Sequence, residues 1–182
     1  CIRDSSLVAL TPEHLVAVRD PRGIRPLCLG TRRWTDEWGK AHLAWLVSSE
    51  SCGFDVIDAR YERDITPGEM VVIDRHGPRS IWPFEPRPEA FCVFEYVYFA
   101  AVTSEIDGMS VYDARKRLGE ELARIEPFDV NDKDWAIIPV PNTARPIANS
   151  YAKAIGLPQI YDEGLIASEK SRTFIDGGDR SK

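Results

Sequence analysis

The chain changes its sequence character near residue 83, and this change constrains the fold more than any other feature. Before it, short apolar or alternating runs separated by turn residues predict a β-rich region. Residues 83–88 hold three prolines, which predicts an extended linker. We therefore predict two domains, residues 1–88 and 89–182. The predicted strands of the first are Ser6–Leu10, Leu15–Arg19, Ile24–Leu29, Ala41–Ser48 and Met70–Asp74.

After the linker, the pattern alternates between strands and helices. Apolar residues recur at three- and four-residue spacings over Ser110–Arg124, which predicts an amphipathic helix opened by a capping box. A β-rich half followed by an alternating half predicts an α/β protein. The other elements predicted here are a strand or buried extended segment at Phe91–Ala100, a strand at Trp135–Val140, a helix from about Thr143 to Ile155, and short strands at Gln159–Tyr161 and Leu165–Ala167.

The segment Ile137–Ala154, IIPVPNTARPIANSYAKA, predicts a buried strand, a tight loop and the start of a helix. Asn142 or Thr143 can cap such a helix, and Pro146 is tolerated in its first turn. The backbone N–H groups at a helix start also attract anions such as phosphate. Local physics alone favours an ordinary capped helix, and a phosphate site is the alternative.

Composition and charge exclude several function classes. The net charge is −6 and the pI is about 5.2, without a basic stripe, which argues against nucleic-acid binding. No apolar run approaches the roughly 20 residues that a membrane span needs, and we find no signal-peptide pattern at Cys1. Cys1, Cys28, Cys52 and Cys92 show no paired spacing, so we expect reduced thiols and a cytoplasmic location.

Seven segments, in order and over almost the whole chain, resemble the amidophosphoribosyltransferase family, also called glutamine phosphoribosylpyrophosphate amidotransferases. Each match is weak alone, but together they are specific. They are VRDPRGIRPLCLG at 18–30, VSSESCGF at 47–54, DITPGEMVVID at 64–74, CVFEYVYFA at 92–100, VYDARKRLGEELA at 111–123, IPVPNTARP at 138–146 and RTFI at 172–175.

The resemblance implies the C-terminal part of an N-terminal-nucleophile-hydrolase-type glutaminase domain, with αββα layers, followed by the N-terminal part of a type I phosphoribosyltransferase domain. The family converts phosphoribosyl pyrophosphate and glutamine to 5-phosphoribosylamine, the first step of de novo purine biosynthesis. It uses Mg²⁺, and some members also carry a 4Fe–4S cluster. A homo-oligomer is expected for the full-length protein.

The same resemblance implies roles for individual residues. Asn142 and Thr143 match the substrate-binding Pro-Asp-Ser loop, so Thr143 is also the candidate Mg²⁺ contact, while Asn142 replaces an acid. Arg172 and Thr173 match the flexible catalytic loop that closes over bound substrate. Cys92 matches a position that binds an iron–sulfur cluster in some members, although the residue pattern itself favours a buried core thiol.

Two departures from the family favour an internal fragment that lacks both ends. Cys1 is followed by Ile2 and Arg3, where the family has a processed catalytic Cys followed by Gly. The acidic-pair motif that binds phosphoribosyl pyrophosphate does not occur before Lys182. We therefore expect this chain alone to be inactive. The alternative is a non-catalytic binding or regulatory paralogue; another nucleotide-binding phosphoribosyltransferase would leave the first ninety residues unexplained.

The remaining polar residues of the β-rich half are predicted to have structural roles. Residues Ser48–Glu50 are predicted to form a capped turn. Further along the chain, Ala101 replaces an arginine of the family, so the interdomain contact that the arginine would make is lost. The predicted charge network around Gly23 consists of Arg19, Asp20, Arg22 and Arg25, and the histidines expected at the surface are His14, His42 and His76.

Overall fold

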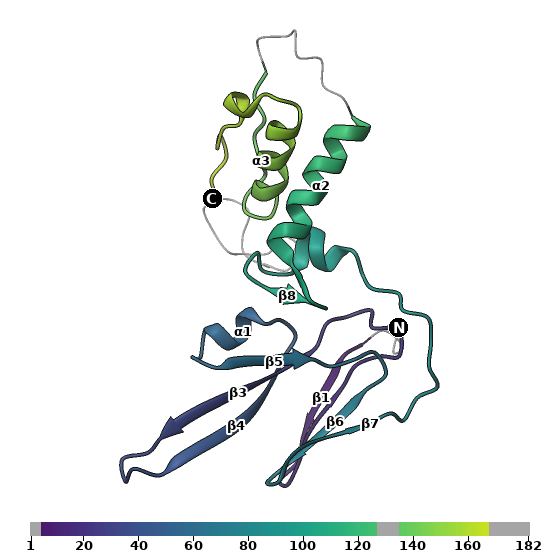
Figure 1. Ribbon diagram of the computed structural model, residues 1–182, viewed down its shortest axis with the longest axis vertical. Helices are drawn as coiled ribbons and strands as arrows, with labels where there is room; N and C mark the ends of the chain where they lie inside the picture. The colour runs from purple at the N-terminus through teal and green to yellow at the C-terminus, as the bar shows by residue number, and fades with distance from the viewer. Residues whose placement is uncertain (1–4, 127–134, 168–182) are drawn as a thin grey trace, which may run out of the picture. The chain divides into compact units, whose positions relative to one another are not determined.

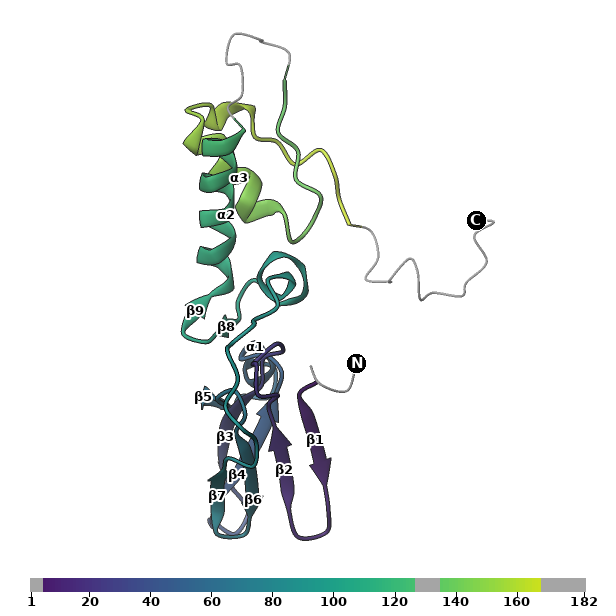
Figure 2. The same ribbon diagram turned by 90° about the vertical axis from the view of Figure 1, so that its right-hand side faces the viewer.

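The computed structural model describes residues 5–126 and 135–167. The chain folds into two compact units that divide between Ala114 and Arg115, and each is described by itself (Figures 1 and 2). Residues after the predicted linker pack within the first unit, because the N–H of Ala90 donates to the carbonyl of Arg22. The domain boundary predicted at residue 88 stays a prediction.

Two antiparallel sheets form most of the first unit. The four-stranded sheet has the order β1-β2-β6-β7, and the three-stranded sheet has the order β4-β3-β5. A short helix, α1 (Cys52–Asp55), follows β4 and places the ring of Phe54 against Gly30. The strands are β1 (Leu7–Leu10), β2 (Leu15–Val18), β3 (Cys28–Thr35), β4 (Ala41–Ser48), β5 (Arg60–Asp64), β6 (Met70–Asp74) and β7 (Gly77–Ile81).

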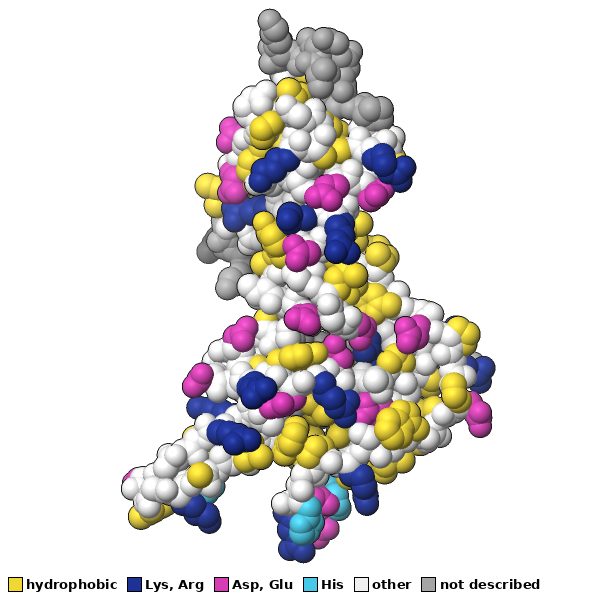
Figure 3. Space-filling view, in the orientation of Figure 1, with side chains coloured by type: hydrophobic (Ala, Val, Ile, Leu, Met, Phe, Trp, Pro, Cys, Tyr) yellow, Lys and Arg dark blue, Asp and Glu magenta, His cyan; other side chains and the backbone are white. Residues whose placement is uncertain are grey.

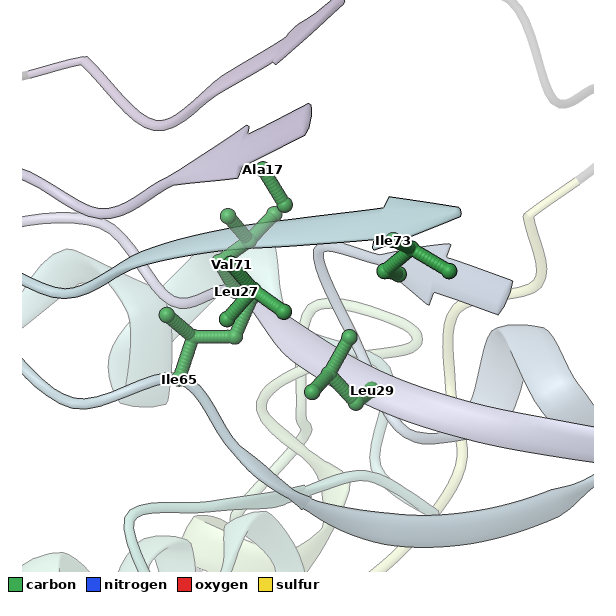
Figure 4. Packing of buried hydrophobic residues seen from close by; sticks show 6 residues of the cluster. All are labelled: Ala17, Leu27, Leu29, Ile65, Val71 and Ile73. Atoms are coloured by element: carbon green, nitrogen blue, oxygen red, sulfur yellow. The ribbon is translucent and has the colours of Figure 1, made fainter. Parts of the chain in front are cut away.

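The two sheets face each other across one apolar core (Figure 4). Alternate residues of β2, β3 and β6 point into it, as expected for strands with one buried face. Trp45 and Val47 of β4 pack against its side. The buried residues of this core are Ala17, Leu27, Leu29, Ile65, Val71 and Ile73.

The structure confirms four of the predicted strands and corrects the fifth. The strand predicted at Ile24–Leu29 begins only at Cys28 and continues to Thr35, where it forms a hairpin with the strand Ala41–Ser48. The charged strand β5, RYERD, was not predicted, because it has no apolar alternation.

The segment after the linker is helical where we predicted an extended chain. Residues Glu95–Phe99 form a π-helix, so the prediction of an extended segment at Phe91–Ala100 is wrong. A two-stranded hairpin follows, formed by β8 (Glu105–Ile106) and β9 (Met109–Ser110). A second apolar cluster, separate from the sheet core, lies in this part of the chain. It contains Ala100, Ile106 and Val111, with Phe91 and Tyr96 packed against them.

Two helices dominate the second unit. The predicted helices are confirmed as α2 (Val111–Ile125), whose first turn belongs to the first unit, and α3 (Arg145–Ala154). The apolar face of α2 is only partly covered, since Leu122 remains 40% exposed.

The predicted strands of this unit are wrong. Trp135–Val140 makes a single parallel bridge, from Ile137 to Tyr161, and Pro158–Ile160 is a 3₁₀ turn where Gln159–Tyr161 was predicted as a strand. Leu165–Ala167 has no regular structure.

Acidic and basic side chains are mixed on the face shown in Figure 3, with apolar side chains between them. In the described part of the chain, no helix is long and apolar enough to cross a membrane.

Candidate functional site

The loop before α3 holds the predicted substrate-binding residues. Ile137 is fixed by backbone hydrogen bonds to residues 160 and 162, at 2.8 and 3.1 Å. The chain then turns through Pro141–Ala144, with a cis peptide bond between Pro141 and Asn142, and enters α3. Asn142 is exposed and Thr143 is half-buried, and both residues belong to the turn that precedes α3.

The start of α3 has no side-chain cap. Its N-cap residue is Ala144, which has no side chain able to accept a hydrogen bond, so the prediction that Asn142 or Thr143 caps the helix is wrong. The helix begins two residues later than predicted, at Arg145, which places Thr143 one residue before the N-cap. First-turn N–H groups such as that of Ile147 therefore receive no capping side chain, and these are the groups that attract anions.

Arg145 is a cation at this helix start that the sequence did not single out. Its Nη2 forms a 2.7 Å ion pair with Glu163. Its Nε is buried without a hydrogen-bond partner in the part of the chain that the structure describes. No motif distinguishes this arginine in the sequence, and its pairing with Glu163 depends on the fold.

Close packing of α3 on α2 holds the loop in place. A Cβ atom on Gly119 would lie 2.2 Å from the carbonyl oxygen of Ile147, so the two helices meet at a contact that tolerates only glycine. The Ser150 hydroxyl donates to the carbonyl of Lys116, and the Tyr151 hydroxyl donates to the carbonyl of Glu126 at 3.2 Å. The rigid helix pair therefore fixes where the loop residues lie.

In the first unit, Arg19 is the centre of a buried polar network. It is 1% exposed, and its guanidinium donates to both carboxylate oxygens of Asp107, at 2.7 and 2.8 Å. Burial lowers the pKa of Arg19, but hydrogen bonding and attraction to Asp107 and nearby acids raise it overall, so the charge is retained. The carboxylate of Asp20 binds the N–H groups of Arg22 and Ile24, which confirms the predicted structural role of this turn.

Glu50 and Glu95 make two further long-range polar contacts in the first unit. Glu50 accepts hydrogen bonds from the backbone N–H of Ala101 at 2.7 Å and from the Ser104 hydroxyl at 2.9 Å. Glu95, 8% exposed in its side chain, pairs with Arg25 at 2.5 Å. Sequence reasoning gave residues 48–50 a turn role and missed this long-range contact. In the sequence, Glu50 follows two serines, which indicates a polar turn, but no local pattern indicates that Glu50 binds residues 101 and 104.

His42 also differs from its prediction as a surface histidine without a partner. It lies 2.7 Å from the Asp36 carboxylate and stacks on the Trp34 ring at 5.1 Å between centroids. These contacts bridge the far end of the β3–β4 hairpin. The hydrogen bond that the Asp36 carboxylate accepts from His42 lowers the pKa of Asp36.

Cys92 is half-buried rather than fully buried, and its N–H donates to the carbonyl of Ile24 at 3.2 Å. The described residues contain no group of three or more metal-binding side chains. A 4Fe–4S cluster needs four thiolates, so these residues do not hold one by themselves. The cluster role of Cys92 stays a prediction.

The two predicted catalytic residues, Arg172 and Thr173, lie outside the described residues. The structure brings Asn142 and Thr143 together on the α3 loop, and it does not test their roles.

No family model matches the chain. It is 44% identical over 172 residues to the amidophosphoribosyltransferase of Synechococcus elongatus, a match that covers 93% of this chain and 32% of that protein. The enzyme of the same name from Mus musculus is 42% identical over 181 residues, covering 93% and 34% respectively. The chain therefore spans about a third of the length of the curated relatives it matches.

The structure also matches the glutamine phosphoribosylpyrophosphate amidotransferase of B. subtilis, solved with ADP and GMP. The TM-score is 0.74 at 34% sequence identity, over 95% of this chain and 35% of that one. The predicted resemblance is thus confirmed in sequence and in fold, as is the fold class of a glutaminase joined to a phosphoribosyltransferase. The chain is homologous to about a third of these enzymes.

Proposed function

We propose that this chain, as a homologue of the amidophosphoribosyltransferases, is part of an enzyme that makes 5-phosphoribosylamine from phosphoribosyl pyrophosphate and glutamine. One observation carries the proposal: the similarity continues through the sheets of the first unit and the helices of the second in a single alignment. A fold match to one unit alone would be compatible with many functions.

In this proposal the α3 loop binds the pyrophosphate side of the substrate. The uncapped N–H groups at the start of α3 and the helix dipole favour negative charge there. The Arg145 guanidinium adds a positive charge beside the loop, which its ion pair with Glu163 partly offsets. Preorganised donors of this kind stabilise the charge that develops on a departing pyrophosphate.

Oxygen atoms at the loop suit Mg²⁺ in part. Thr143 and Asn142 offer a hydroxyl and an amide carbonyl, which are hard ligands, and Mg²⁺ is commonly held by substrate phosphates and water with few protein ligands. Mg²⁺ would neutralise pyrophosphate charge when bound. The chain's own contribution is then to orient the substrate oxygens, and Arg172 and Thr173 would exclude water by closing over them.

A non-catalytic paralogue is the second candidate. Asn142 stands where the family has an acid, and Ala101 where it has an arginine. Both changes remove charges that the family uses, which is the observation that favours this reading.

Genetic complementation distinguishes an active enzyme from a non-catalytic paralogue. The complete gene that encodes this chain is expressed in a purine-auxotrophic host that lacks the enzyme, under purine-free conditions. We expect growth, and we expect the gene shortened to these 182 residues to give none, since it spans a third of its relatives. Expression of the full product without growth would support the paralogue. The cytoplasmic location and homo-oligomeric state remain part of the proposal.

A further inference from the structure

The segment from Glu95 to Ser110 contacts the sheets of the first unit through polar and charged groups. Its apolar side chains pack in their own cluster with Ala100, Ile106 and Val111, whereas the sheet core is a different cluster. Interfaces that are polar and hydrogen-bonded, without a continuous apolar core, open more easily than apolar ones. Specific polar contacts therefore hold the segment, and the ion pair of Glu95 with Arg25 is one of them.

The firmest contact is at the β8–β9 turn. Asp107 and Gly108 both have positive φ, 48° and 74°, as a two-residue hairpin turn of this kind requires. Arg19 binds the Asp107 carboxylate with two hydrogen bonds, and the Asp64 carboxylate accepts the N–H of Asp107 at 2.8 Å. Two charged groups thus hold the turn. The Arg19 guanidinium binds the Asp107 side chain, and the Asp64 carboxylate binds the Asp107 backbone N–H.

Arg19 is fixed on the sheet side before it meets Asp107. Its Nη1 donates to the carbonyl of Ile65 at 2.9 Å, and its Nε donates to the carbonyl of Arg25 at 3.1 Å. Asp107, by contrast, is 41% exposed in its side chain. The sheet therefore presents a preorganised guanidinium, and the hairpin supplies the partner that can leave.

A second contact lies at the start of the hairpin. Glu50 binds the N–H of Ala101 and the hydroxyl of Ser104, and the Ser51 hydroxyl accepts the N–H of Glu105 at 2.8 Å. These bonds again join a sheet-side acceptor to backbone N–H groups of the segment.

We propose that residues 95–110 form a flap that opens from the sheets as a unit, and that Arg19, Glu50 and Asp64 are the latch that holds it closed. Opening exposes the three amides bound by sheet-side oxygens, those of Ala101, Glu105 and Asp107, while both sheets stay folded. This inference does not depend on the proposed function, because it concerns contacts within the first unit.

Amide hydrogen exchange of the full chain tests the latch with Asp107→Asn. Asparagine also favours the turn conformation, since Asn-Gly is a preferred pair there, but it removes the charge that Arg19 binds. We expect the amides of Ala101, Glu105 and residue 107 to exchange about tenfold faster or more, because a buried ion pair that loses one charge is strongly weakened. Amides of β6 should be unchanged.

Arg63→Met is the matched control. Arg63 makes an equally close bidentate pair, with Glu69, within the sheet side. It should leave exchange at residues 101–107 unchanged. Equal acceleration in the flap and in β6 by Asp107→Asn would show global unfolding and overturn the proposal, as would no acceleration in the flap.

Glu50→Gln is a second variant, at the other contact of the flap, and it should also accelerate exchange of the flap amides. Glutamine keeps the acceptor oxygen and loses the charge, so Ala101 and Asp107 should accelerate together if the flap opens as a unit. Acceleration at Ala101 alone would contradict a concerted flap and favour two independent local contacts.

Discussion

Arg63 of β5 and Glu69, the residue before β6, meet through two hydrogen bonds of 2.9 and 2.7 Å, and Glu69 is only 1% exposed. The carboxylate also accepts hydrogen bonds from the N–H and hydroxyl of Thr66 and from the hydroxyl of Ser80. A buried carboxylate keeps its charge only with such partners.

This arrangement predicts a loss of stability in acid. Burial would raise the pKa of Glu69, but the hydrogen bonds from Arg63, Ser80 and Thr66 outweigh it and lower the pKa to about 2. The folded state therefore binds this proton less readily than the unfolded state, so the stabilisation is present above about pH 4.5 and is lost as pH falls towards 2. Replacing Glu69 by Gln should cost about 2 kcal/mol at pH 7 and flatten the unfolding free energy over that range.

Chemical denaturation at pH 7, 4 and 3 measures this directly. Glu13→Gln, at an exposed position, is the control and should leave the curve unchanged. A Glu69→Gln variant as stable as wild type at pH 7, with the same acid response, would contradict the assigned role.

The contact between α2 and α3 predicts that Gly119→Ala is destabilising. The new Cβ would lie 2.2 Å from the Ile147 carbonyl oxygen, so the helices must separate, and overpacking of this kind costs about 1–3 kcal/mol. Helix propensity alone would make Gly119→Ala stabilising, so a fall in the free energy of unfolding would point to the close contact. Glu120→Ala, one residue further on and exposed, should be neutral or stabilising in thermal unfolding, and equal loss from both variants would contradict the contact.

The cysteines are predicted to differ in reactivity. Cys28 is 1% exposed, and burial, with the charges of Asp64, Cys52 and Glu50, raises the pKa of its thiol to about 12. Alkylation with iodoacetamide at pH 8, followed by peptide mass spectrometry, should label Cys52 and Cys92 well before Cys28, since thiolate is the reactive form. A faster rate at Cys28 would contradict this description of the core.

The substrate-binding role proposed for the α3 loop predicts a selective effect of Thr143→Ala in a complete enzyme. Glutamine hydrolysis should be unchanged, whereas kcat/KM for phosphoribosyl pyrophosphate should fall by about tenfold or more, because an oxygen contact to the pyrophosphate side is lost. Thr143→Ser keeps the hydroxyl and should restore most of the activity. An equal fall in both variants, or a fall in glutamine hydrolysis with Thr143→Ala, would assign Thr143 a structural role.

The sequence predicted the elements whose apolar residues recur at a regular spacing. The helices α2 and α3 were recovered within two residues of their ends, and β1, β2, β4 and β6 within one, because amphipathic faces and alternating strands leave a local signal. The fold class followed from the resemblance rather than from any single pattern.

Other elements depend on distant partners. Phe91–Ala100 carries aromatic and β-branched residues, yet its part Glu95–Phe99 folds as a π-helix, and Glu95 pairs with Arg25, 70 residues away. The strand β5 was missed since its residues are charged. Within the described residues, Trp135–Val140 pairs through one bridge, from Ile137 to Tyr161, so its apolar run is not a regular strand there.

The candidate site was predicted in part. Asn142 and Thr143 were identified, but no local pattern indicated that Arg145 pairs with Glu163. The contacts of Arg19, Glu50 and Asp107 connect residues separated by more than 50 positions, and no local pattern predicts such pairs.

The most direct test is pyrophosphate release by the purified product of the complete gene, with phosphoribosyl pyrophosphate and Mg²⁺, in the presence and absence of glutamine. We predict release that depends on glutamine, and none from the 182-residue chain alone. Release by the 182-residue chain alone, or none from the folded complete product, would contradict the account.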